Sequence, residues 1–238
     1  SDAAQKEMLP YKVIDNQRRP TLIICNGDAS NMSWQQIMFA TIYAANGFNV
    51  VTFDWRGFGK SSAFEMNPNY LCYTEMLVDY EAVIQSVKEQ PEVDTDNIYL
   101  FGWSTGAYLS MITAYRNENV KGAFLMSIPS SFEEVIPILV KVHPKGKTEQ
   151  DLLVPKDFPR EQMPIYIASS FTKPILLIAG KKDDRTPIWM ARNIYKALPH
   201  NTYKKLSVYK GAGHGGMKSP SVVNSKKFFK ETIGFLKY

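Results

Sequence analysis

The feature that most constrains the fold of this chain is the alternation of short β-rich apolar runs with longer amphipathic stretches. This alternation is typical of a parallel sheet with helices on its faces, because a strand buried on both sides reads as a continuous apolar run. The sequence therefore predicts an α/β fold. The expected strands are Thr21 to Cys25, Asn49 to Phe53, Asn97 to Phe101, Gly122 to Ser127, Pro174 to Ala179 and Tyr203 to Tyr209.

The amphipathic stretches place apolar residues at helical spacing and carry recognisable stop signals. Gly47 ends the first helix and Pro91 ends the second. In the closing helix we expect Ser219 as the N-cap and Pro220 at the first helical position. The expected helices are 33–45, 74–90, 104–116, 187–198 and one from Ser219 to the end with Val223, Phe229, Ile233 and Leu236 facing the core.

One domain over residues 1–238 is the default, because 45% hydrophobic residues supply enough apolar material for a single core. Only the stretch from Ile128 to Thr172 breaks the alternation, since it holds six of the fourteen prolines and is too long for an ordinary βα connection. It reads either as a cap over a site at the strand ends or as a surface excursion. We favour the cap, because such long loops are usually functional or disordered.

Composition excludes several classes of protein. No apolar run approaches the ~18 residues of a membrane span. The formal charge of +5 comes from basic residues scattered among acidic ones, so the charge pattern does not indicate nucleic-acid binding. Two cysteines, Cys25 and Cys72, cannot build a disulfide framework or a zinc site, and three histidines leave little scope for a metal centre. We therefore expect no metal.

The chain begins at Ser1 without an initiator Met and shows no signal-peptide pattern. We expect a processed or trimmed form. The sequence does not decide its cellular location, although the cytoplasm is slightly preferred over a secreted or periplasmic location.

The residues Gly102-Trp103-Ser104-Thr105-Gly106 stand directly between a predicted strand and a predicted helix. The letters alone are a weak signal, but a sharp strand-to-helix turn needs small residues around the serine and pushes its hydroxyl out at the sheet's edge. This placement makes Ser104 the candidate nucleophile.

A serine hydroxyl needs a base within hydrogen-bond reach and a carboxylate to orient that base. His214 follows the last strand in a glycine-rich loop, whereas His143 and His200 are expected on the surface. The pair Asp183-Asp184 follows the strand from Pro174, and we prefer Asp183. The chain order Ser, Asp, His is the one used by α/β-hydrolases.

An acyl-transfer site also needs donors for the developing oxyanion. The backbone N–H of Thr105, which follows the nucleophile, is one candidate. The second is the N–H of Asp28, or less favourably Ala29, in the turn after the first strand. A simple Asn-Gly turn is the alternative.

With these residues, nearly the whole chain resembles the α/β-hydrolase superfamily, and specifically its esterase and serine-peptidase-like members with a modest cap. The loop from Phe53 to Ser61 also looks like a loop of these proteins, in which Asp54, Arg56 and Ser61 would be structural. The resemblance implies an acyl-enzyme on Ser104 and no cofactor.

The chain departs from this family at three places. Asn26-Gly27 stands where many members have His-Gly, only Tyr11 to Ile14 is available as an opening strand, and Gly215-Gly216 makes the base loop pliable.

The leading hypothesis is a serine hydrolase of the carboxylesterase type that acts on a small-molecule ester. Apolar residues of the long insertion suggest an acyl or aromatic group, although they could equally form a cap core; they are Phe132, Ile136, Leu139 and Tyr166. A peptidase, a thioesterase or a lipase would use the same residues, and a ligand-binding module on a hydrolase scaffold is the alternative from another class. The sequence leaves the natural substrate, the acyl length and the oligomeric state open.

Overall fold

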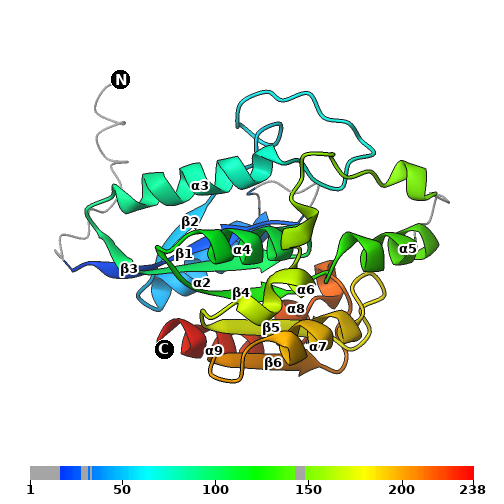
Figure 1. Cartoon of the computed structure of the whole chain (residues 1–238). Helices are drawn as coiled ribbons and strands as arrows, with labels where there is room; N and C mark the ends of the chain where they lie inside the picture. Colours follow the sequence, from blue (N-terminus) through cyan, green and yellow to red (C-terminus); the bar gives the residue numbers. More distant parts are fainter. Residues whose placement is uncertain (1–16, 28–31, 33, 143–147) are drawn as a thin grey trace.

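A computed structural model describes residues 17–27, 32, 34–142 and 148–238 of the chain. Its centre is a six-stranded sheet in the order β2-β1-β3-β4-β5-β6, in which every neighbouring pair is parallel (Figure 1). The strands are β1 Arg19–Cys25, β2 Asn49–Thr52, β3 Val93–Trp103, β4 Val120–Met126, β5 Ile175–Gly180 and β6 Lys204–Tyr209. The predicted α/β fold with a parallel sheet is confirmed.

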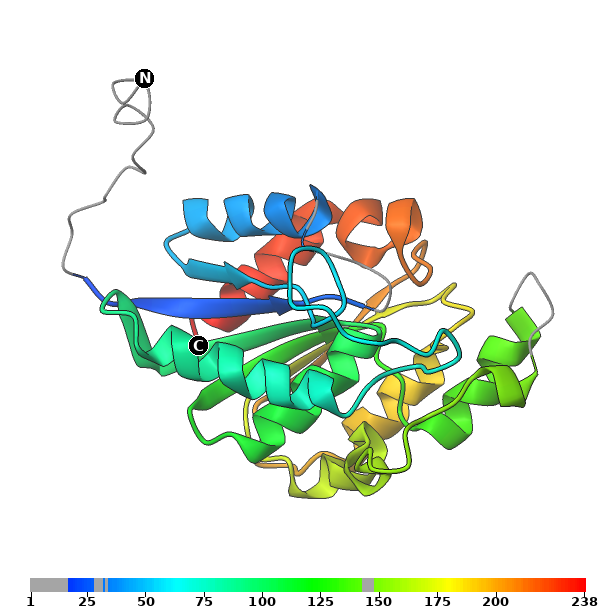
Figure 2. The ribbon, with the colours of Figure 1, turned by 90° about the horizontal axis from the view of Figure 1, so that it is seen from above.

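Helices cover both faces of this sheet. One layer contains α2 (Trp34–Ala45) and α9 (Ser225–Leu236), and the other contains α3 (Glu75–Lys88), α4 (Thr105–Arg116) and α7 (Ile188–Ala197) (Figure 2). The chain passes from β1 to β2 on one side of β1, and β3 then pairs with the other side of β1. Ligands of open α/β sheets bind at the carboxyl ends of the strands beside such a reversal of strand order.

The period of two along a strand divides the core into two layers. Leu22 and Ile24 of β1 are buried against the layer that includes Phe39 of α2, and Ile23 and Cys25 are buried on the opposite face. A shift of one residue would exchange the two sets between the layers, so the apolar pattern fixes the register of β1.

The predicted closing helix is wrong in two respects. It consists of a short α8 (Pro220–Val223) and the longer α9, separated by Asn224, whose backbone is not helical (φ −145°, ψ 70°). The Asn224 side chain accepts a hydrogen bond from the amide of Lys227 at 3.1 Å, so it caps a new helix start and ends the first one. As a result Val223 is 45% exposed instead of facing the core, whereas Leu236 is buried as expected.

The connection between β4 and β5 contains more regular structure than its prolines indicate. Helix α5 carries Pro137 on its exposed side and buries Phe132 against Tyr108 of α4, with ring centroids 5.5 Å apart. Both views show α5 extending beyond the sheet on the side toward which the strands point (Figures 1 and 2). The elements are α5 Phe132–Val142, η1 Glu149–Asp151, η2 Arg160–Gln162, α6 Pro164–Ile167 and η3 Ala168–Ser170.

The apolar candidates of this connection have different environments. Phe132 is buried in the core, Ile136 and Leu139 are partly buried against it, and Tyr166 is 52% exposed. Phe132 therefore serves packing. A cap role for the connection stays a prediction.

Within the part of the chain that the structure describes, no helix is both long and apolar enough to cross a membrane.

Candidate active site

Ser104 occupies the junction between β3 and α4. Its backbone has φ 55° and ψ −116°, a left-handed conformation that is unfavourable for a residue with a side chain. Strain of this kind persists only where the surrounding structure enforces it, and it is concentrated at functional sites. The turn lets the helix start immediately after the serine and leaves Ser104 partly accessible at the carboxyl end of β3.

The two glycines around Ser104 are required by backbone contacts. A Cβ on Gly102 would lie 2.2 Å from the carbonyl oxygen of Gly106, and a Cβ on Gly106 would lie 2.3 Å from that of Asn26. Both distances are far below van der Waals contact with backbone atoms that cannot move independently. The steric crowding that we expected around the serine is thus found at both glycines.

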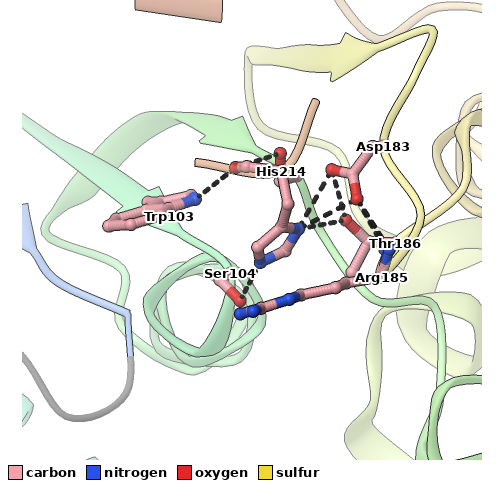
Figure 3. A network of polar contacts seen from close by, with 7 residues as sticks. Trp103, Ser104, Asp183, Arg185, Thr186 and His214 are labelled. Atoms are coloured by element: carbon pink, nitrogen blue, oxygen red, sulfur yellow. Dashed lines mark hydrogen bonds and ion pairs between the residues drawn. The ribbon is translucent and has the colours of Figure 1, made fainter. Parts of the chain in front are cut away.

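His214 follows β6 and lies beside Ser104. Its Nε2 atom is 2.9 Å from Ser104 Oγ, and its Nδ1 atom is 3.0 Å from each carboxylate oxygen of Asp183 (Figure 3). The structure thus brings together three predicted residues that are separated by up to 110 positions in the chain. The alternative carboxylate, Asp184, is exposed.

Asp183 accepts several further hydrogen bonds. The amides of Arg185 and Thr186 donate to its Oδ1 at 3.0 and 2.8 Å, and the Thr186 hydroxyl donates to its Oδ2 at 2.9 Å. Burial by itself would raise the pKa of Asp183, but the bond and charge of His214 and the Thr186 amide outweigh it and hold that pKa below its ordinary value. The carboxylate therefore stays ionised beside the imidazole.

The sequence did not identify the residues that position this pair. Thr186 Oγ also lies 3.2 Å from His214 Nδ1, so its hydroxyl contacts both partners. The carbonyl oxygen of His214 accepts hydrogen bonds from Trp103 Nε1 at 3.0 Å and from Ser127 Oγ at 3.3 Å. Trp103 stands inside the serine motif, but nothing in the sequence shows that its ring reaches the histidine loop.

The pliable loop after His214 has a steric explanation. A Cβ on Gly215 would lie 2.2 Å from Trp103 Cζ2, so only glycine lets the indole ring pack against this loop. The indole can then donate to the His214 carbonyl and hold the histidine loop near Ser104. Gly215 is therefore a packing requirement.

Of the two expected oxyanion donors, the structure describes Thr105 but not Asp28. The amide of Thr105 opens α4, and no described residue accepts a hydrogen bond from it. Asp28 and the alternative Ala29 lie outside the described residues, as do His143 and Tyr11 to Ile14. Gly27, directly before Asp28, is close to the turn between β3 and α4, since a Cβ on it would lie 3.5 Å from Ser104 Cβ.

The remaining residues named in the sequence analysis lie away from Ser104. His200 is exposed, as expected. Arg56 is held by Asp79 through a hydrogen bond of 2.8 Å from Nε to Oδ1, and Ser61 Oγ donates to the Asp54 carbonyl at 2.6 Å. These contacts hold the loop after β2 together and fasten it to α3, and they do not reach Ser104.

Arg185 is a charged group near the serine that the sequence did not single out. Its residue is exposed, and Figure 3 shows its side chain pointing toward Ser104. The hydrogen bond from its amide to Asp183 fixes its backbone beside the site.

A chain of hydroxyl, imidazole and buried carboxylate can move a proton away from the serine oxygen and make it nucleophilic. A metal ion or an organic cofactor is not required for this chemistry.

The sequence was also compared with known proteins. The profile of the prolyl oligopeptidase family matches residues 30–237. The uncharacterized protein YfhR of Escherichia coli K12 is 28% identical over 177 residues, which are 74% of this chain and 56% of YfhR. Protein bem46 of Schizosaccharomyces pombe is 23% identical over 172 residues, which are 72% of this chain and 54% of bem46. The chain thus spans about half the length of these curated relatives.

Among solved structures, an esterase of Pyrococcus furiosus superposes with a TM-score of 0.74 and 22% identity, over 94% of this chain and 84% of the esterase. At this identity the likeness shows the fold, which is that of the α/β-hydrolases.

Proposed function

Since this chain belongs to the prolyl oligopeptidase family within the α/β-hydrolase superfamily, we propose that it is a serine hydrolase that cleaves a carboxylic ester through an acyl-enzyme. The observation that carries the proposal is the continuous contact from Ser104 Oγ through the imidazole of His214 to the buried carboxylate of Asp183, with distances of 2.9 and 3.0 Å.

In the first half of the reaction Ser104 Oγ attacks the ester carbonyl carbon while His214 Nε2 takes the hydroxyl proton. Asp183, whose pKa is held low although burial would raise it, stays ionised and stabilises the imidazolium. The tetrahedral intermediate collapses, the imidazolium gives its proton to the departing alcohol, and the acyl group stays on Ser104. Water then attacks the acyl carbon with His214 as base, the bond between that carbon and Ser104 Oγ breaks, and the imidazolium returns its proton to Oγ as the carboxylic acid leaves.

The negative oxygen of the tetrahedral intermediate needs two preorganised donors. We assign these to the amides of Thr105 and Asp28. The support for Thr105 is its place at the start of α4, where the N–H points away from the helix without an acceptor among the described residues. Asp28 is supported by its place after Gly27, which lies close to Ser104.

Peptide cleavage is the second candidate, because the matched family is named for an oligopeptidase. The same residues can cleave amides, thioesters and esters. An ester is the broader expectation, since an alcohol leaves more readily than an amine.

The first experiment measures hydrolysis of p-nitrophenyl esters from acetate to palmitate, together with labelling by a fluorophosphonate probe. We expect Ser104→Ala and His214→Ala to lower the rate by several orders of magnitude and Ser104→Ala to abolish labelling. Ser62→Ala and His200→Ala are matched controls, because both residues are exposed and lie outside the site. Peptidyl p-nitroanilides tested in parallel distinguish a peptidase from an esterase.

Equal rates in the wild-type chain and Ser104→Ala would contradict the proposal. Stabilisation by a ligand without turnover would then indicate a binding module on a hydrolase scaffold.

A further inference from the structure

The charge of this chain is concentrated in its last 35 residues. Residues 204–238 contain eight lysines, no arginine and a single acidic residue, Glu231, so this segment carries a formal charge of +7. The remaining residues hold 20 basic and 22 acidic side chains, a formal charge of −2. The basic residues are therefore less evenly scattered than the balance of the whole chain indicates.

Helix α9 gathers a large share of these lysines on one side. Lys226 and Lys230 of α9 and Lys237 directly after it are exposed, whereas Phe228 and Phe235 on the opposite side are buried in the core. The spacing of the three lysines places them along one stripe of the helix, because residues four and eleven positions apart share a face.

The edge strand β6 extends this stripe. Lys205 Nζ lies 3.2 Å from Glu231 Oε1, and Lys227 Nζ lies 4.2 Å from the centre of the Tyr209 ring. We call Lys205, Lys226, Lys227, Lys230 and Lys237 the basic face; a groove of about 500 Å³ is lined by three of them.

Glu231 compensates the charge of one lysine of the basic face, Lys205. Hydrogen bonds from Ser207 and Tyr209 occupy its Oε2 atom, at 2.5 and 2.9 Å, and Lys205 occupies its Oε1 atom. Burial would raise the pKa of Glu231, but these hydrogen bonds hold it below its ordinary value. The exposed lysines of α9 have no carboxylate partner among the described residues, so their positive charge is available to a partner.

Exposed apolar side chains lie beside the basic face. Met217 is 78% exposed, Val222 37% and Val223 45%, and we call these three residues the apolar tip. A Cβ on Gly211 would lie 3.3 Å from Val223 Cγ1, which places Val223 beside the turn that follows β6. The split between α8 and α9 is what turns Val223 outward.

We propose that the basic face and the apolar tip together dock the protein on the surface of an anionic phospholipid membrane. Lysines are flexible point charges suited to a diffuse layer of lipid phosphates and carboxylates, and apolar side chains beside them can enter the interface. Nucleic-acid recognition favours arginine forks and stacking platforms, and residues 204–238 contain no arginine.

Docking in this orientation brings the candidate active site close to the lipid surface, because Met217 is only three residues from His214. The inference concerns binding and does not depend on the proposed hydrolase activity.

The test is co-sedimentation of Ser104→Ala protein with phosphatidylcholine vesicles that contain or lack phosphatidylserine. We expect binding only to the anionic vesicles, and loss of binding when ionic strength rises from about 0.1 M to about 1 M. The triple variant Lys226→Glu, Lys230→Glu, Lys237→Glu should bind at least on the order of 100-fold more weakly, since each lysine lost near a membrane costs roughly a factor of five and each new carboxylate adds repulsion.

The matched control carries three Lys→Glu substitutions at other exposed positions, Lys141, Lys156 and Lys196. It should retain most of its binding to the anionic vesicles. Met217→Ser with Val222→Ser should weaken binding, whereas Ile37→Ser with Val78→Ser, which removes equally exposed apolar groups from α2 and α3, should not. Thermal unfolding checks that each variant is folded.

The proposal would be refuted if both lysine variants lost vesicle binding to the same extent, or if the protein bound neutral and anionic vesicles equally. So would retention of an RNA or DNA oligonucleotide by the same lysines without any vesicle binding. The p-nitrophenyl ester assay is run separately on active protein, so its failure would affect only the proposed function.

Discussion

The hydroxyl of Thr186 provides a direct test of how the carboxylate at the site is held. Thr186 is buried, and its Oγ atom lies 2.9 Å from Asp183 Oδ2 and 3.2 Å from His214 Nδ1. Thr186→Val replaces this hydroxyl by a methyl group of nearly the same shape and keeps the backbone amide that donates to Asp183 Oδ1 at 2.8 Å. The substitution therefore removes one donor from an ionised acceptor without opening a cavity.

A hydrogen bond to a charged group stabilises a protein by about 1.5–3 kcal/mol. We expect Thr186→Val to lower the free energy of unfolding at neutral pH by about this amount, and kcat for a p-nitrophenyl ester to fall by roughly tenfold to a hundredfold if the loss reaches the transition state in full. Loss of a donor to the carboxylate also raises the pKa of Asp183, so the stability difference should shrink in acid.

Urea unfolding at several pH values and ester kinetics measure the two effects separately. Thr186→Ser retains the hydroxyl and should recover most of kcat. Unchanged stability and unchanged kcat in Thr186→Val would show that the hydroxyl does not support the carboxylate.

Three other predictions concern the same structure. Gly215→Ala should displace Trp103 from a Cβ that would lie only 2.2 Å from its ring, with a loss of about 1–3 kcal/mol of stability in thermal unfolding and slower fluorophosphonate labelling. The pKa of Asp183 is below its unfolded value in spite of burial, so its stabilisation is present above the unfolded pKa of about 3.9 and is lost as pH falls through the folded pKa. Urea midpoints between about pH 5 and pH 3 should therefore fall more steeply for the wild-type chain than for Asp183→Asn, and parallel profiles would contradict this. Burial raises the pKa of both Cys25 and Cys72, the latter to about 12, so a thiol reagent at neutral pH should modify them only in denaturant; rapid labelling of the native protein would count against this burial.

The prediction from sequence was most successful where short-range physics decides the structure. The strand sequences are continuous apolar runs and the helices have their own stop signals, so the α/β alternation and the order of the elements could be read directly. Ser104 was identifiable because a strand-to-helix turn restricts its neighbours to glycine, and His214 because a glycine-rich loop follows the last strand.

The sequence misled where two local signals compete. Ser219-Pro220 is a good helix start, but Asn224 is a second start only a few residues later, and both are used. The balance depends on how α9 packs against the sheet, which the local sequence does not contain. The outward turn of Val223 follows from that packing.

The sequence by itself determined the fold class, the order Ser104, Asp183, His214 along the chain, and the conformation that each of their loops needs. Only the tertiary structure decided which groups surround them, including Thr186 at the carboxylate and Trp103 at the histidine carbonyl. It likewise decided that Lys205, Lys227 and Lys230 line one groove. The physical reason is that backbone sterics and apolar periodicity act between residues close in sequence, whereas hydrogen bonds and charges act between side chains that the packing of parallel strands brings together from distant positions.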